Sequence, residues 1–355
     1  MNEAAERYVR LALALGQHDR DYVDAYYGPP EWKSEAEAAR RPLSEIRAEA
    51  AALSTLVLAM PDSGDERDRQ RRRFLGRQLE ALAARADLLS GKTMSFDEES
   101  RALYDAAAPV HTEEHFQALL ARLEAELPGP GALTERYDAF RQDLVIPREK
   151  LDTVFRAAIA AARERTSRRI LLPAGESFTV EYVTGKPWSG YNWYQGSYRS
   201  LIQVNTDLPI HIDRAIDLAC HEGYPGHHVY NALQEKNLVR DRGWIEFQVY
   251  PLFSPESLIA EGSANYGIEM AFPGGERLAF EQETLFPLAG LDPARAERYA
   301  RVRALAEGLS YAGNEAARRY VNGQIDAAAA ASWLTAYGLM TPARAGQRVR
   351  FIAQY

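Results

Sequence analysis

One stretch of this chain, residues 177–205, has the composition of β-strands, and it lies between long stretches with helical periodicity. It is rich in β-branched and aromatic residues and is divided by Gly190, which indicates two or three antiparallel strands. Elsewhere apolar residues recur at helical spacing, and Pro or Gly often marks the end of a run. We expect helices over residues 3–16, 43–59, 65–90, 113–126, 147–169 and 292–322. The pattern predicts a mainly α protein with one small antiparallel sheet in the middle of the chain.

The length of the chain bears on the number of lobes. At about 150 residues per domain, 355 residues predict two lobes. We place a helical N-terminal lobe over residues 1–170 and a second lobe, which holds the small sheet and the helices after it, over residues 171–355. Hydrophobic residues make up 46% and charged residues 26%, which excludes a disordered or fibrous chain.

Charge and cysteine content exclude several kinds of partner and site. Acidic residues number 50 and basic residues 42, and the net charge of -8 argues against general nucleic-acid binding. Glu3 and Glu6 precede the first short apolar run, so the start resembles neither a signal peptide nor a membrane span. Cys220 is the single cysteine, which excludes intramolecular disulfides and cysteine-based zinc fingers. We expect a soluble, cytoplasmic protein with no nucleic-acid or membrane partner, whose oligomeric state the sequence does not indicate.

Histidines cluster directly after the predicted strands. The centre of the cluster reads His-Glu-Gly-Tyr-Pro-Gly-His-His over residues 221–228. In the zinc motif His-Glu-x-x-His, two histidines four residues apart share one helix face, and the Glu beside the first acts as general base. His221 and Glu222 match the first half of that motif, but His227 and His228 come six and seven residues after His221.

Pro225 and Gly226 bear on whether this spacing is compatible with a metal site. On an unbroken helix, six residues correspond to a rotation of roughly 240° and seven residues to about 10 Å along the axis, so neither later histidine could share a metal with His221. Proline clashes with the preceding turn and restricts the residue before it, and glycine permits a positive φ. We therefore expect a helix break that could bring His227 back beside His221.

A third ligand is expected further along the chain. Two imidazoles leave zinc short of a protein ligand, and catalytic sites commonly add a Glu. Glu261 lies in an apolar helical stretch, where an ionised carboxylate is costly unless it is paired or bound to a metal. Asn265 follows one turn later and is a candidate to orient a ligand histidine.

These residues resemble a large, mostly uncharacterised bacterial family known as domain of unknown function 885. The pattern of that family is His-Glu-x-x-Pro-Gly-His, followed by a helix with Glu-Gly-x-Ala, and residues 221–227 and 261–264 match it. The segments DYVDAYYGPPEW, LPGPGALTERY and GYNWYQGSYRS are also similar to members of the family. The family resembles helical zinc peptidases such as carboxypeptidase Taq and thimet oligopeptidase, which implies a zincin-like fold and a catalytic second lobe.

The resemblance implies a role for each matched residue. His221 and His227 would bind one Zn²⁺ per chain, Glu261 would be the third ligand, and Glu222 would be the general base. The position after Pro-Gly-His varies in the family, which favours His227 over His228 as the ligand. Ser263 stands where the family usually has Trp, which widens or polarises the wall of the site.

Aromatic residues are candidates for the substrate side of the site. Tyr191, Trp193 and Tyr194 lie next to a predicted strand over residues 198–205 that could hold an extended peptide, although they could equally pack the sheet. Tyr311, in a segment where the family also has a Tyr, is a candidate donor to the oxyanion, and packing is the alternative role.

Three other side chains near the motif have simpler interpretations. His228 is expected to point outward or to support a ligand, and His211 to begin the helix. Cys220 neighbours His221, but adjacent helical residues point about 100° apart, so a core position is expected rather than a nucleophile.

Two further patterns compete with the motif. His111, Glu114 and His115 match the inverted zinc motif His-x-x-Glu-His. They lie at a predicted helix start, where acidic residues suit the helix dipole, and no third ligand is evident. The arginine-rich run over residues 67–73 is expected to be a solvated helix face rather than an anion site.

Three functional hypotheses follow. The first is a zinc-dependent hydrolase of peptide-like amides that acts on short peptides. The second is a non-catalytic helical binding protein that holds a structural metal or none, and the third is a metal hydrolase of non-peptide amides or esters.

Overall fold

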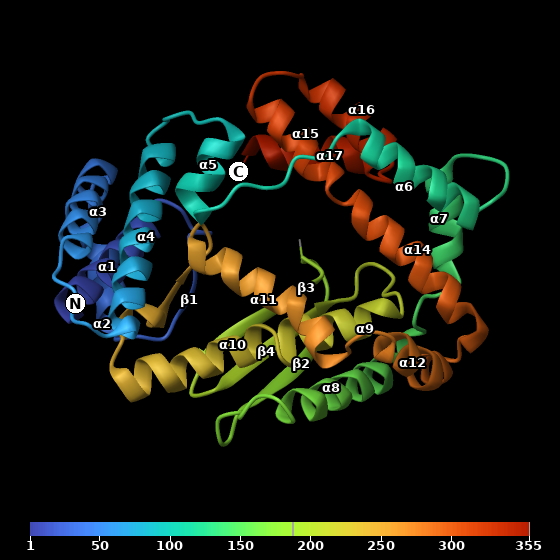
Figure 1. The fold of residues 1–355 in the computed structure, drawn as a ribbon, viewed down its shortest axis with the longest axis horizontal. Coiled ribbons are helices and arrows are strands. Elements are labelled where there is room, and N and C mark those ends of the chain that lie inside the picture. Colours follow the sequence, from blue (N-terminus) through green and yellow to red (C-terminus); the bar gives the residue numbers. More distant parts are fainter. Residues whose placement is uncertain (187, 355) are drawn as a thin grey trace.

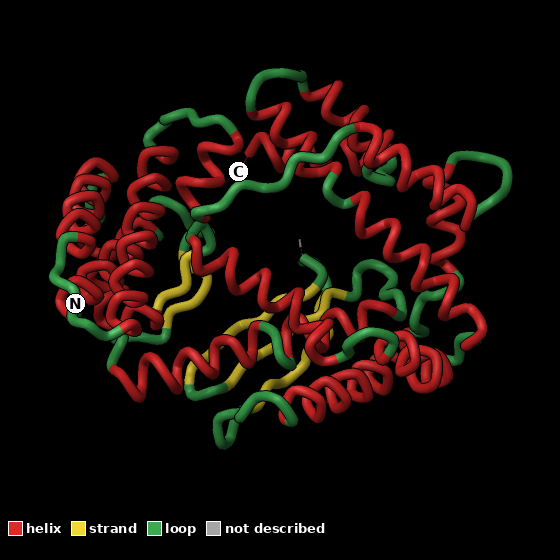
Figure 2. Tube along the Cα trace, in the orientation of Figure 1, coloured by secondary structure: helices red, strands yellow, loops and turns green. Residues whose placement is uncertain are grey.

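The computed structural model describes residues 1–186 and 188–354 and shows a mainly α protein, as predicted (Figure 1). Strands are confined to two small sheets, and helices form most of the rest of the described chain (Figure 2). Three groups of helices, each with its own buried cluster of apolar side chains, follow one another in an arc. No helix within the described ranges is both long enough and apolar enough to cross a membrane.

The first group of helices lies at the N-terminal end. Its members are α1 (Asn2–Leu15), α2 (Pro30–Ala39), α3 (Leu43–Leu58) and α4 (Glu66–Leu89). Three of them match predicted helices to within about a residue or two, because amphipathic periodicity is a strong signal in long helices. Leu11, Leu53 and Leu79 are among the side chains that fill the core between them. The Asp65 carboxylate caps α4 by accepting from the N–H of Arg67.

The middle group surrounds the three-stranded sheet. Its members are α8 (Leu151–Ser167), β2 (Ser177–Val183), β3 (Gly190–Gly196), β4 (Arg199–Asn205), α9 (Asp213–Leu218), α10 (His227–Gln234), α11 (Pro255–Ala271), α12 (Glu276–Phe280) and α13 (Phe286–Ala289). Shorter turns complete it at Arg148–Lys150, Ala219–Gly223, Glu235–Arg240, Ile245–Gln248 and Glu281–Leu285. The sheet precedes the helix that leads into the histidine motif, as predicted.

The strand order of this sheet is β2-β4-β3. The expected antiparallel pairing holds for β3 and β4, which Ser197 and Tyr198 join in a tight hairpin with positive φ. The prediction was wrong for β2, which pairs in parallel with β4. The reason is that β4 occupies the centre of the sheet and pairs with both other strands. Because each strand runs opposite to the one before it in the chain, β4 runs in the same direction as β2.

A second, two-stranded sheet joins the N-terminal group to the middle group. Strand β1 (Val23–Tyr26) pairs antiparallel with β5 (Val249–Pro251), and Ala25 lies opposite Tyr250. The sequence analysis expected no strand before residue 177. A strand of four residues gives too short a pattern to be recognised without its partner.

The third group combines helices from both halves of the sequence. Its members are α6 (Glu113–Glu126), α7 (Leu133–Gln142), α14 (Ala296–Leu309), α15 (Ala312–Val321), α16 (Ala327–Tyr337) and α17 (Pro342–Gln354). Helix α5 (Phe96–Tyr104) lies between this group and the first and contacts both α4 and α15. The single helix expected over residues 292–322 is instead a short turn at Pro293–Arg295 followed by α14 and α15, which Ser310 and Tyr311 separate. Phe116 of α6 and Leu309 of α14 share one core. The division into lobes at residue 170 stays a prediction, and this core lies across it.

Candidate metal centre

The helix that carries the first motif histidine ends in a widened turn. Helix α9 runs into a π-helical turn at Ala219–Gly223, and α10 begins at His227. The N–H of Gly226 donates to the backbone oxygen of Cys220 at 2.8 Å, so the chain folds back onto the end of the helix. A Cβ on Gly226 would lie 1.9 Å from the backbone oxygen of His221, which is why only glycine fits here. The predicted helix break is therefore present, and it lies between the histidines.

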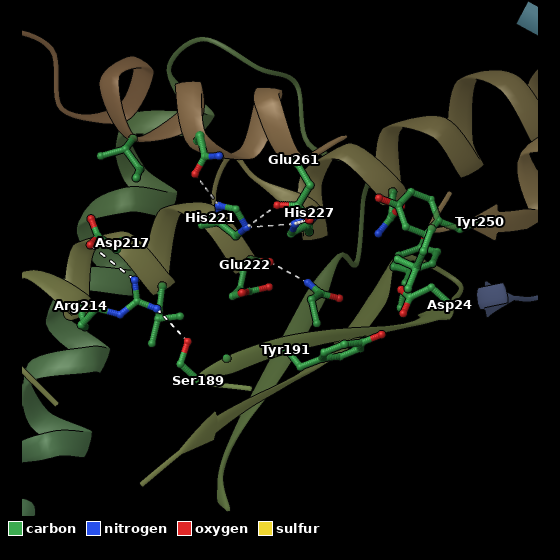
Figure 3. A pocket seen from close by; sticks show the side chains of 18 of the residues that line it. Asp24, Ser189, Tyr191, Arg214, Asp217, His221, Glu222, His227, Tyr250 and Glu261 are labelled. Carbon is green, nitrogen blue, oxygen red and sulfur yellow. Dashed lines mark hydrogen bonds and ion pairs between the residues drawn. The ribbon is translucent and has the colours of Figure 1, made fainter. Parts of the chain in front are cut away.

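Three side chains converge at this break. The Nε2 atoms of His221 and His227 lie 3.2 Å apart. Oxygens of Glu261, on α11, lie 3.4 Å from Nε2 of His221 and 3.2 Å from Nε2 of His227 (Figure 3). Within the described ranges, this is the group of His, Cys, Asp or Glu side chains close enough together to hold a metal ion.

Asn265 orients one of the two imidazoles. Its Oδ1 lies 3.1 Å from Nδ1 of His221. An amide oxygen can only accept, so Nδ1 of His221 is placed to donate to it, and Nε2 faces His227 and Glu261. The structure therefore brings Asn265 to the position that the sequence analysis gave it.

The charges at this cluster are mutually stabilising. Hydrogen bonds from His221 and His227 hold the pKa of Glu261 far below its usual range. Burial opposes a charge on His221, but the hydrogen bond to Glu261 and the nearby charge of Glu222 outweigh it and raise the pKa of His221. The cluster can therefore hold positive charge next to the Glu261 carboxylate.

Glu222 lies beside the cluster and is buried. Burial is the main cause that raises the pKa of its carboxyl group. In the described part of the chain, this carboxyl group has no hydrogen bond or ion pair. Its backbone is fixed from the sheet, because Nδ2 of Asn192 donates to the Glu222 backbone oxygen at 2.6 Å. Oδ1 of Asn192 is buried and has no hydrogen-bond partner among the residues that the structure describes.

The cluster opens onto a cavity of about 680 Å³ between the three groups of helices. A volume of this size is typical of sites that bind small molecules. The sheet, α9, α11, α14 and strand β1 all contribute to its wall. Figure 3 shows Arg214 on one side of Glu222, where its guanidinium donates to Ser189 Oγ at 3.2 Å, and Asp24 on the other side.

Asp24 was missed by the sequence analysis. It lies on β1 and lines the cavity, and burial raises the pKa of its carboxyl group to about 6. The charge of His227 opposes this rise, and those of Glu261 and Glu222 add to it. The signal that could have identified Asp24 was the segment DYVDAYYGPPEW, which resembles the family but carries no motif for a site. Asn192 and Arg214 were missed because no spacing rule marks them.

The four candidate aromatic residues differ in whether the structure brings them to the cavity. Tyr191 and Tyr194 line the cavity, and Tyr194 also donates to Glu235 at 2.5 Å. Trp193 is exposed, stacks on Tyr191 and does not line the cavity. Tyr311 is not brought to the cluster, because its ring packs against His111 at 5.0 Å, at the start of α15.

His228 points away from the cluster. It is fully buried, with Nε2 3.0 Å from Glu176 and Nδ1 2.9 Å from Ser200 Oγ. His211 contacts Arg141 at 3.0 Å, and burial lowers its pKa to about 4. Cys220 is a buried core residue, and burial raises the pKa of its thiol to about 12. None of the three joins the metal cluster.

The side chains of the two competing patterns, the inverted zinc motif and the arginine-rich run, contact other side chains of the protein. The rings of His111 and His115 stack at 4.6 Å, and no metal-binding group forms around them within the described residues. In the arginine-rich run, Arg69 and Arg73 pair with Glu66 near the surface. The expectation of a solvated face was wrong for Arg71, which is buried in a two-pronged ion pair with Glu246.

Comparisons with known proteins add little to this geometry. No family model matches the chain, and no curated protein matches it. One similar solved structure is "the putative lipoprotein from Colwellia psychrerythraea", with 17% identity and a TM-score of 0.46. The alignment covers 91% of this chain and 63% of that chain. At this TM-score the similarity supports no inference, and the resemblance to domain of unknown function 885 stays a prediction.

Proposed function

We propose that this protein is a zinc-dependent hydrolase of peptide-like amide bonds that acts on short peptides. The observation that carries the proposal is the convergence of His221, His227 and Glu261 beside the buried carboxyl group of Glu222. Two imidazoles and one carboxylate are the protein ligands of many catalytic zinc sites, which keep a further position open. We expect one zinc ion per chain.

The donor atoms fit such an ion. A tetrahedral site with bonds of about 2.0–2.1 Å separates any two ligand atoms by about 3.3–3.4 Å. The separations among His221, His227 and Glu261 are 3.2, 3.4 and 3.2 Å. The hydrogen bond of His221 to Asn265 supports the tautomer that such a ligand needs.

The residues of the chain provide the rest of the chemistry. When bound, the ion would supply a positive charge that acidifies a water molecule and polarises the scissile carbonyl group. Glu222 would accept a proton from water and deliver it to the leaving amine, because its carboxyl group lines the cavity and has no hydrogen bond or ion pair within residues 1–186 and 188–354. Its raised pKa moves it toward the pH at which such transfers are efficient.

The metal site is tested by elemental analysis of protein purified without chelators. We expect about one zinc per wild-type chain and its loss in His221→Ala. His115→Ala is the matched control, since it removes an exposed histidine from the competing motif, and it should retain the zinc. Absence of zinc from the wild type, even after zinc is supplied at neutral pH, would contradict the proposal and favour a helical binding protein.

The reaction is tested with Glu222→Gln. This variant should bind zinc as the wild type does but hydrolyse short peptides roughly 10²–10⁴-fold more slowly, which is the usual contribution of a general base. Full activity in the variant would refute the role of Glu222. A zinc-loaded wild type that cleaves esters or non-peptide amides, but no peptide, would support the hypothesis of a non-peptide hydrolase.

A further inference from the structure

The cavity holds a charged group that the proposed chemistry does not use. We propose that the carboxylate of Asp24 binds the ammonium group of a peptide substrate, either its α-amino terminus or a basic side chain. The inference rests on the proposed peptidase function and defines its substrate class, which is peptides with a positive charge near the scissile bond.

The position of Asp24 relative to the metal cluster is fixed by backbone pairing. Asp24 is the extra residue of a β-bulge between Val23, which pairs with Pro251, and Ala25, which pairs with Tyr250. Strand β5 leads within a few residues to Ser254, which caps the helix that carries Glu261. Asp24 and the third metal ligand are therefore held by a single continuous unit, as a specific subsite requires.

The Asp24 carboxylate is free to take a ligand. Among residues 1–186 and 188–354, no group hydrogen-bonds to this carboxylate or forms an ion pair with it. Burying a carboxylate without a partner is costly, and native structures generally satisfy such groups. The side chain lines the cavity, so a ligand can reach it (Figure 3). It lies outside the group of atoms that could hold the metal.

The surrounding charges favour a cation at this position. The charged groups that act on Asp24 are His227, Glu261 and Glu222, of which two are acidic. Arg214 lies on the opposite side of Glu222 (Figure 3). The second arginine of the cavity wall, Arg277, is already paired with Asp217 and Glu281. No arginine of the described cavity wall would therefore compete with an ammonium group near Asp24.

Tyr250 adds an aromatic surface to the same part of the cavity. It lines the wall and is labelled beside Asp24 in Figure 3. A tyrosine ring attracts an ammonium group through its negative face. A carboxylate and an aromatic ring together form a suitable site for a primary amine.

The test uses the zinc-loaded full chain and three peptides: Leu-Ala-Ala, N-acetyl-Leu-Ala-Ala and N-acetyl-Lys-Ala-Ala. If Asp24 binds the α-amino terminus, acetylation of Leu-Ala-Ala should lower kcat/KM about 10- to 100-fold, as for a charge-assisted hydrogen bond. If it binds a basic side chain, the lysine peptide should be preferred over the acetylated leucine peptide by a similar factor. In Asp24→Asn the ratio of kcat/KM between the charged and the uncharged peptide should fall to near one, mainly through a change in KM. Asp21→Asn, which removes an exposed carboxylate from the same segment, should keep the wild-type preference.

A measurement of peptide binding distinguishes a failure of this inference from a failure of the proposed function. Calorimetry on zinc-loaded Glu222→Gln and on the double variant with Asp24→Asn measures the same preferences without turnover. If the wild type cleaves no peptide, the proposed function fails, and the calorimetric preference still decides the role of Asp24. The inference is overturned if charged and uncharged peptides bind and react equally in the wild type, or if Asp24→Asn retains the preference.

Discussion

Replacing Gly226 by alanine tests the geometry that brings the two motif histidines together. The added Cβ would lie 1.9 Å from the backbone oxygen of His221 and 2.4 Å from that of Cys220. Real Cβ atoms essentially never approach another heavy atom closer than 3.0 Å. The chain at residue 226 must therefore move away from the end of the helix by about 1 Å, because a packed interior leaves no room for the overlap.

The cost follows from the kind of atoms that clash. Overpacking typically costs about 1–3 kcal/mol, and a flexible side chain can reduce it by rotating away. Here both clashing atoms belong to the backbone and cannot rotate away. We therefore expect the unfolding free energy to fall by an amount at the upper end of this range, about 3 kcal/mol. The same displacement carries His227 away from His221 and should weaken zinc binding roughly tenfold or more, as losses of ligand orientation do.

Two assays measure these effects. Urea denaturation of the metal-free protein gives the change in unfolding free energy, and competition with a chromophoric chelator gives the zinc affinity. Gly262→Ala is the matched control, because a Cβ there meets nothing within 4 Å and the position is helical. It should stabilise the protein by up to about 1 kcal/mol. A Gly226→Ala protein as stable as the wild type, with unchanged zinc affinity, would refute the geometric argument.

Two further predictions concern buried charges that lie outside the metal cluster. Burial raises the pKa of Glu256 from 4.5 to about 8. Between these values the unfolded chain has lost this proton and the folded chain retains it, so the contribution of Glu256 to the unfolding free energy falls as pH rises. Glu256→Gln should therefore stabilise the protein more at pH 8 than at pH 5, and an equal effect in urea titrations at both pH values would contradict this. Arg71→Ala should cost about 3–5 kcal/mol because it leaves the buried carboxylate of Glu246 unpaired. Arg73→Ala, at an exposed pair, should cost less than about 1 kcal/mol in the same measurement, and similar losses in both variants would argue against the buried pair.

The candidate metal centre could be predicted from the sequence in part, because three of its residues are close in sequence. His221, Glu222 and His227 lie within one short segment, and Pro225 and Gly226 marked the break between them. Glu261 was indicated by the resemblance, since the argument from burial does not hold for a side chain that is 52% exposed. Asn265 follows it by one helical turn.

The remainder of the cavity depends on contacts between distant segments. Asp24 reaches the cavity only because a four-residue strand pairs with β5, far along the chain, and no local pattern announces that pairing. The parallel pairing of β2 with β4 is equally non-local. Tyr311 was placed by resemblance alone, and in the structure the end of α14 directs it toward His111 instead.

The short β1–β5 sheet has a consequence for how this protein can vary. The two strands are adjacent in space but are separated along the chain by most of the helices. Insertions in the intervening surface loops would leave the separation of Asp24 from Glu261 unchanged, because hydrogen bonds between the strands and the start of α11 set it. A slip of one residue in the pairing would instead turn the Asp24 side chain to the other face of the sheet. If Asp24 binds the substrate as we propose, substrate preference in this scaffold would be insensitive to loop length and highly sensitive to strand register.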